Sequence, residues 1–198
     1  MRSPARQRGN ALLETALILP LLIGTALISA DLYNVSQARS YLEQSAHNIA
    51  SVLAMQNRLD SAGLQALIEQ AASPALLGDY ELVISRVSLD RKMPWKPLLR
   101  GSEVNLCPVY SEEQYYTGEL PEEQPDSEKE NQATPSTSAT TLLVVQLCRN
   151  SDDLALSSGL LADKTMQSIA FSRMSYDDLV LDDTLADEVG QEQDDEAN

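Results

Sequence analysis

The 198-residue sequence predicts an α+β protein in which a long N-terminal helix precedes a small antiparallel sheet domain. Two observations support this class. An apolar run from Ala11 to Ala30 is followed, without Pro or Gly, by a helical repeat that reaches about Gln56. Beyond residue 57, short β-branched runs alternate with turn residues, a pattern typical of strands.

Composition excludes several classes of function. Asp and Glu number 30 against 14 Lys and Arg, a formal net charge of −16, whereas a nucleic-acid binder needs a basic face. One His and two Cys leave no cluster for zinc or iron–sulfur ligation. No phosphate-binding loop or nucleophile elbow appears. We therefore expect no cofactor, no metal, no nucleic-acid partner and no enzymatic activity.

The first thirty residues are the most informative part of the chain. Of the 20 residues from Ala11 to Ala30, 14 are Ala, Leu or Ile. A helix of this length rises about 30 Å, the thickness of a bilayer's hydrocarbon core. Arginines precede the run and acids follow it, so the positive-inside rule keeps the N-terminus in the cytoplasm and places residues 31–198 across the membrane.

Three interpretations of this segment remain open. It is a secretory signal peptide cleaved near Ala30, an uncleaved membrane anchor, or a prepilin-type leader cut between Gly9 and Asn10 with the apolar helix retained. Glu14 favours the third, because a carboxylate within an apolar span costs roughly 2.5–3.5 kcal/mol at the bilayer centre. After cleavage, the new α-amino group of Asn10 on a neighbouring subunit would pair with Glu14 and offset that cost.

Four residues carry a resemblance to a known family. Arg8-Gly9, then Glu14, then Pro20 six residues later, resemble the N-terminus of TadE/TadF-like minor pseudopilins of tight-adherence (Tad) pilus systems. Asp31 stands where that family often has an acid at the end of the apolar run. The resemblance covers residues 6–57.

The resemblance implies a pilin-like fold and a structural role. A prepilin peptidase would cleave the basic leader, residues 1–9, and the helix of residues 10–57 would stay in the bacterial inner membrane with the C-terminal domain in the periplasm. The helix would pack with other pilin-like subunits during assembly of a Tad-type pilus, which serves adhesion, biofilm formation and colonisation. The alternative is an uncleaved, membrane-anchored periplasmic binding module that recruits a partner protein.

The helix is expected to continue beyond the membrane as an amphipathic half. Apolar residues recur at helical spacing and form one stripe, which consists of Val35, Ala38, Leu42, Ala46, Ile49 and Leu53. His47, the single histidine, lies off this stripe, and we expect it to be exposed. Pro20 removes one backbone donor, which predicts a point where the membrane half bends.

Residues 58–176 are predicted to form the periplasmic domain. Asp60 and Ser61 are expected to begin a second helix that ends before Pro74. Strands are predicted at 80–89, 104–109, 141–149 and 164–174, with a helix as the alternative for the last, and residues 93–97 form a turn in which Trp95 packs locally. We expect a mobile acidic loop at 111–140, because its composition cannot offset the entropy of ordering. The tail at 177–198 is acidic. Its residues Leu179, Val180, Leu181 and Leu185 could form a short helix, and its last ten residues are expected to be solvated.

Cys107 and Cys148 are predicted to form a disulfide, since each lies near a strand end and export exposes both to an oxidising compartment. Closing this loop would stabilise a small domain by roughly 4 kcal/mol in the chain-entropy model. Two separate buried thiols are the alternative.

Overall fold

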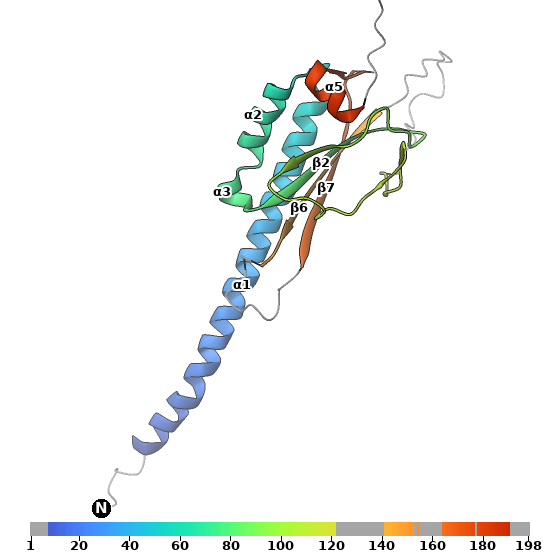
Figure 1. Cartoon of the computed structure of the whole chain (residues 1–198). Helices are drawn as coiled ribbons and strands as arrows, with labels where there is room; N and C mark the ends of the chain where they lie inside the picture. The colour runs from blue at the N-terminus through green and yellow to red at the C-terminus, as the bar shows by residue number, and fades with distance from the viewer. Residues whose placement is uncertain (1–7, 122–140, 153, 155–163, 177, 191–198) are drawn as a thin grey trace, which may run out of the picture. The chain divides into compact units, whose positions relative to one another are not determined.

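The computed structural model describes residues 8–121, 141–152, 154, 164–176 and 178–190. They form a mixed α+β structure with a long helix and a small antiparallel sheet (Figure 1), as predicted. Two compact units divide the chain: residues 1–38 with 151–164, and residues 39–150 with 165–198. The leader residues 1–7 lie outside the described residues.

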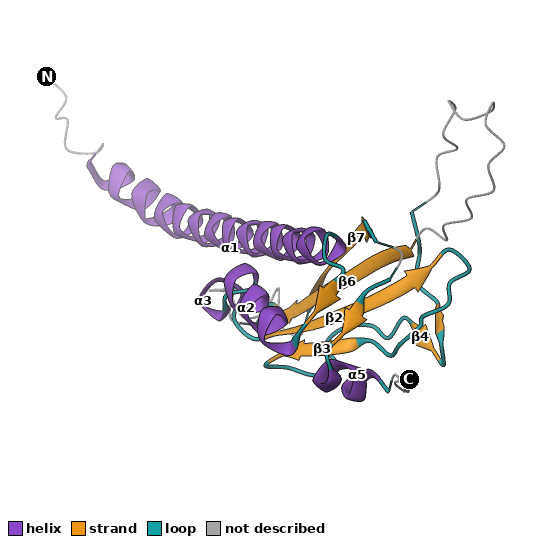
Figure 2. Ribbon diagram, turned by 90° about the horizontal axis from the view of Figure 1, so that it is seen from above, coloured by secondary structure: helices purple, strands orange, loops and turns teal. Residues whose placement is uncertain are grey.

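The long helix, α1 (Arg8–Ala54), begins two residues before the expected range of 10–57, ends three residues before its end, and continues through Pro20. Within the second unit, its residues from Leu42 onward pack on the sheet (Figure 2). The predicted stripe is confirmed, because all of its members except the half-buried Val35 are buried, and His47 is exposed. The sequence period therefore identified the buried face of this helix.

Two short helices follow α1. Helix α2 (Ser61–Ala71) begins where predicted, because the Asp60 side chain accepts a hydrogen bond from the N–H of Gly63 and so caps the helix. Helix α3 (Pro74–Leu77) starts at a proline, whose missing N–H costs nothing at a helix start. Both helices lie on the same side of the sheet as α1 (Figure 2).

The main sheet has four antiparallel strands in the order β3-β2-β6-β7. The central pair, β2 (Tyr80–Ser88) and β6 (Thr141–Asn150), confirms two predicted strands. Strand β7 (Thr165–Arg173) is also confirmed as a strand, which makes the helical alternative wrong. Strand β3 (Leu98–Gly101) forms the other edge.

The two faces of the sheet have different neighbours. Leu82 and Ile84 of β2 point into the main core beneath α1, while Val83 packs beside the disulfide and Val87 in a separate apolar cluster on the opposite face. Trp95, in the irregular segment before β3, is buried in the main core, as expected for a packing residue. We call the face opposite α1 the outer face.

Two predictions for the middle of the chain are wrong. Residues 104–109 form an irregular segment rather than a strand, because the backbone N–H groups of Asn105, Leu106 and Cys107 donate to a side chain instead of a neighbouring strand. Residues 111–121 are not part of a mobile loop: β4 (Ser111–Glu112) and β5 (Tyr115–Tyr116) form a hairpin with Tyr116 buried. The remainder of the expected acidic loop, 122–140, lies outside the described residues.

The expected acidic tail is folded over its first part. Residues Val180–Leu181 form β8, which pairs in parallel with β1 (Arg58–Leu59), and Asp183–Val189 form helix α5. Five apolar side chains of this region enter the main core: Leu179, Leu181, Leu185, Ala186 and Val189. Packing therefore continues past residue 176 to the Gly190 cap, while residues 191–198 lie outside the described residues.

Candidate functional site

The N-terminal part of α1 carries the residues that the sequence identified for processing. Gly9 and Asn10 lie in the first turn of the helix, because α1 begins at Arg8. Glu14 is exposed and lies four residues after Asn10, a rise of about 6 Å along the helix axis. The carboxylate is thus one helical turn from the expected cleavage bond, on a surface open to contact by another molecule.

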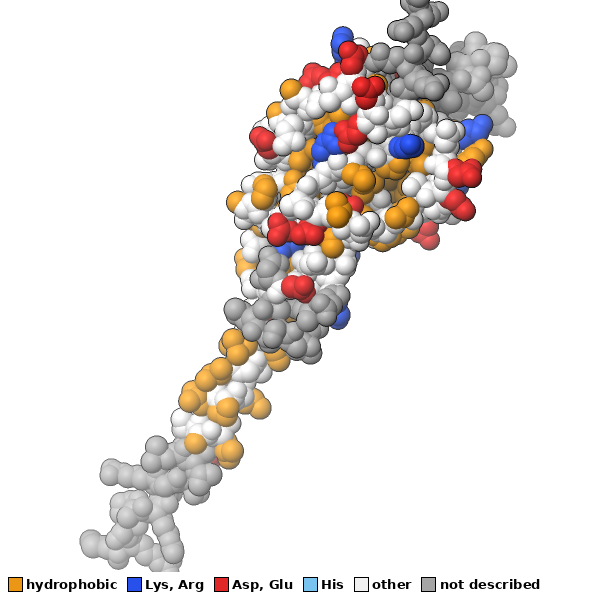
Figure 3. Space-filling view, viewed as in Figure 1, with side chains coloured by type: hydrophobic (Ala, Val, Ile, Leu, Met, Phe, Trp, Pro, Cys, Tyr) orange, Lys and Arg blue, Asp and Glu red, His pale blue; other side chains and the backbone are white. Residues whose placement is uncertain are grey.

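Apolar side chains cover the exposed surface of this part of α1 (Figure 3). The helical segment that begins at Glu14 is long and apolar enough to cross a membrane. The rest of the chain covers almost none of its most apolar stretch. The large exposed side chains there are Leu17, Ile18, Leu19, Leu21, Leu22, Ile23, Leu27, Ile28, Leu32 and Tyr33. Such a surface is stable in lipid or against other apolar helices, and not in water.

Polar side chains within this surface are satisfied locally. The hydroxyl of Thr25 donates to the carbonyl of Leu22 at 2.9 Å, and that of Ser29 donates to the carbonyl of Thr25 at 2.8 Å. Because each hydroxyl donates to a carbonyl of its own helix, neither needs a water molecule as acceptor, and both residues are compatible with an apolar environment.

The end of the apolar run is marked by a change in burial. Asp31 is only 4% exposed, although the sequence alone gave no reason to expect a buried acid there. One turn later, the Asn34 amide donates to the carbonyl of Leu154 at 3.4 Å. This hydrogen bond lies within the first compact unit, in which Leu154 lies beside the helix.

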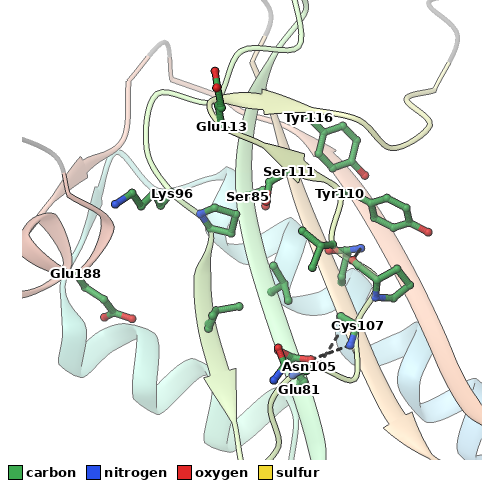
Figure 4. Close-up of a pocket in the computed structure, with 16 residues that line it drawn as sticks. Glu81, Ser85, Lys96, Asn105, Cys107, Tyr110, Ser111, Glu113, Tyr116 and Glu188 are labelled. Carbon is green, nitrogen blue, oxygen red and sulfur yellow. Dashed lines mark hydrogen bonds between the residues drawn. The ribbon is translucent and has the colours of Figure 1, made fainter.

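A second candidate site is a groove on the outer face of the sheet, which sequence reasoning missed. Its volume is about 510 Å³. Figure 4 shows Ser85 and Ser111 near its middle, Tyr110 and Tyr116 on one side, and Lys96 and Glu188 on the other. These residues come from β2, the segment before β3, the 105–116 segment and α5, so no local motif identifies the groove.

One end of the groove is fixed by a disulfide and a buried carboxylate. Cys107 and Cys148 are joined, with their Cα atoms 5.4 Å apart, as the sequence predicted. Beside them, the carboxylate of Glu81 accepts hydrogen bonds from the N–H groups of Asn105, Leu106 and Cys107 at 3.1, 2.6 and 2.7 Å. Together these bonds hold the 105–110 segment over the outer face.

An ion pair between β3 and α5 fixes the rim of the groove on which Glu188 lies. The guanidinium of Arg100 on β3 binds both carboxylate oxygens of Glu188 on α5, with one N–O distance of 2.8 Å. The hydrogen bond to Glu188 raises the pKa of Arg100 above its ordinary value, in spite of partial burial. The guanidinium also donates to the Leu99 carbonyl, so this sheet edge is covered by a charged side chain.

Tyr116 is the most deeply buried aromatic residue of the groove wall. Burial raises its pKa to about 12, and its hydroxyl has no hydrogen-bond partner among the described residues. Tyr110 contacts it edge to face, with ring centroids 6.2 Å apart. The phenol therefore stays neutral at physiological pH and acts as an apolar wall.

The described residues contain no group of three or more His, Cys, Asp or Glu side chains placed to hold a metal ion. No protein-family model, curated protein or solved structure matches this chain. The features that bear on function are therefore the N-terminal motif with Gly9 and Glu14, the exposed apolar surface of α1 and the groove.

Proposed function

We propose that the chain is a minor pseudopilin that takes part in the assembly of a Tad-type pilus, with its helix in the bacterial inner membrane and its domain in the periplasm. The observation that supports this proposal is the exposed carboxylate of Glu14 at the start of a helix surface that is predominantly apolar. A lone charge in such a place is costly in lipid unless another molecule neutralises it.

The function then follows from chemistry at the N-terminus. A prepilin peptidase hydrolyses the Gly9–Asn10 bond and releases a leader that carries Arg2, Arg6 and Arg8. The new ammonium group of Asn10 pairs with the Glu14 carboxylate of an adjacent pilin-like subunit. The apolar side chains of α1 then pack against neighbouring helices, and pilus-dependent adhesion and colonisation depend on that packing.

Mass spectrometry of the N-terminus tests this proposal in cells that contain the processing machinery. A mature chain beginning at Asn10 is expected. An intact Met1 would instead favour an uncleaved anchor, and a chain beginning at Asp31 would favour a cleaved signal peptide; either result contradicts the pseudopilin assignment.

A second function is favoured by the groove on the outer face of the sheet. An anchored periplasmic module that recruits another protein needs a concave surface with exposed apolar side chains, and the groove has both. Under this alternative the helix serves only as an anchor, and Gly9–Asn10 stays intact.

A further inference from the structure

The rims of the groove expose apolar side chains to solvent. Leu99 on β3 is 51% exposed and Val109, on the segment held by Glu81, is 79% exposed. Both line the groove together with Pro97 and Pro108. Apolar surface gathered on two sides of a concavity is typical of a binding site, since a bound chain would remove both sides from water.

The floor of the groove carries polar side chains. Ser85, 5% exposed, lines the groove and brings a hydroxyl to it. Gln146, 3% exposed, also lines it, and its amide donates to the Pro108 carbonyl across a long distance of 3.5 Å. Buried polar groups are usually paired. A hydrocarbon chain would offer these side chains no hydrogen bond, whereas a peptide backbone offers donors and acceptors along its whole length.

One rim carries an uncompensated positive charge. The Lys96 side chain is exposed, and no carboxylate of the described residues lies within ion-pair distance of its ammonium group. Glu188 on the same rim is already neutralised by Arg100. Glu113, at another end of the groove, points away from the floor (Figure 4). A ligand carboxylate is therefore attracted to the Lys96 end.

We propose that this groove binds an extended peptide segment of a partner protein, with apolar side chains between Leu99 and Val109 and an acidic group at Lys96. The volume of about 510 Å³ lies within the range of about 300–1,000 Å³ that is usual for ligand sites. This inference names the site of the second function above and does not depend on cleavage after Gly9. A chain processed at Asn10 is equally able to use the groove.

The test is affinity selection of a displayed random-peptide library on the full-length protein in lipid nanodiscs. Selected peptides are expected to combine apolar residues with Asp or Glu. Synthetic versions should bind Leu99→Asp at least about tenfold more weakly, because that change places a charge on the apolar rim. Lys96→Glu should weaken binding at least about threefold and should itself select peptides with Lys or Arg at the acidic position.

Lys92→Glu is the matched control, because Lys92 is an exposed cation outside the groove lining and should leave binding unchanged. If the Leu99→Asp and Lys96→Glu variants both bound the selected peptides as tightly as the wild type does, the peptides would bind outside the groove and the proposal would be wrong. Recovery of no peptides, or of peptides without an acidic residue, would also overturn the proposal. N-terminal mass spectrometry on the same samples reports the pseudopilin assignment separately.

Discussion

The backbone N–H of Cys107 donates to the carboxylate of Glu81 at 2.7 Å, next to the disulfide that joins Cys107 to Cys148. Cys148 is also the residue that faces Glu81 across the β2–β6 pair. A covalent bond and a charged acceptor therefore hold the same segment at the same point of the sheet.

Glu81→Gln should destabilise the protein by about 1–3 kcal/mol, because an amide offers one acceptor oxygen and turns its NH₂ group toward backbone donors. Chemical denaturation of the full chain in detergent, monitored by circular dichroism, measures the change. Glu103→Gln is the control, since the hydrogen bond that this exposed residue makes to the described part of the chain comes from its backbone N–H. Equal stability of the two variants would contradict the role given to Glu81.

Loss of the disulfide should cost about 4 kcal/mol of unfolding free energy, because Cys107 and Cys148 are separated by 41 residues in sequence. The double variant Cys107→Ala, Cys148→Ala tests this in denaturation experiments. Addition of a reductant should lower the stability of the wild type and leave the double variant unaffected. A stability loss below about 1 kcal/mol would mean that Glu81 alone is enough to hold the segment.

Gly101→Ala should be among the most damaging single changes in the domain. The φ angle of Gly101 is +115°, and an added Cβ would lie 2.2 Å from the Tyr80 carbonyl oxygen. That oxygen also accepts the N–H groups of Ser102 and Glu103, so it has little freedom to move. The backbone strain alone is worth about 1–3 kcal/mol, and the steric clash adds to it.

Gly24→Ala provides the matched control for that substitution. Nothing lies within 4 Å of the position that a Cβ would occupy at Gly24, and the residue is helical. Thermal denaturation should therefore show a large decrease in stability for Gly101→Ala and none for Gly24→Ala. Similar melting of the two variants would show that the β3 edge relaxes more easily than its geometry indicates.

Asp182 should make stability sensitive to acid. Its carboxylate accepts the N–H of Ser61 at the start of α2 and that of Leu185 in α5, each at 2.9 Å. The Ser61 bond first, and then the Leu185 bond, hold the pKa of Asp182 below its ordinary value of 3.8. Because the folded pKa is depressed, this stabilisation is complete above about pH 4 and is lost as the pH falls through the lower, folded value.

Melting temperatures measured between pH 2 and pH 7 test that dependence. Asp182→Asn keeps an oxygen acceptor but does not titrate, so its melting temperature should fall less steeply below pH 4 than that of the wild type. Asp187→Asn, on the exposed side of α5, should follow the wild type. If Asp182→Asn and the wild type gave parallel curves, Asp182 would not contribute to the acid sensitivity.

The sequence predicted those parts of the fold that follow from the spacing of apolar residues along one helix or strand. The stripe of α1 identifies its buried face directly from the spacing of apolar residues, and the β-branched run of residues 80–89 identifies β2 as a strand. The capping of α2 was also predictable, because Asp60 satisfies backbone donors only a few residues away. In each case the partners lie on the same element or its immediate neighbour.

Long-range contacts account for the failures. Val104 and Val109 favour a strand by composition, but the carboxylate of Glu81, more than 20 residues away, takes the backbone donors between them. Glu81 itself looks like an ordinary exposed strand residue. The leucines of the acidic tail allowed a short helix, but α5 has only seven residues and is rich in acids, so its sequence does not reveal that Leu185 packs in the main core. The groove combines such segments and was unpredictable for the same reason.

Glu14→Ala should leave membrane insertion and domain stability unchanged but should abolish incorporation into pili. Removing the carboxylate lowers the cost of placing α1 in lipid, so insertion should not suffer, whereas the proposed pairing with the Asn10 ammonium group of a neighbour would be lost. Glu43→Ala is the control, because Glu43 is exposed on the same helix and its carboxylate pairs with Arg39, four residues away on the same helix.

Membrane fractionation and shear-released pili from cells that express each variant measure the two steps separately. Both variants should be found in the inner membrane, and N-terminal mass spectrometry should find both cleaved at Asn10. Only Glu14→Ala should fail to enter, or to support, the pilus fraction. Normal piliation by Glu14→Ala would remove the reason for a carboxylate at this position, because the charge would then carry its insertion cost without an intermolecular partner.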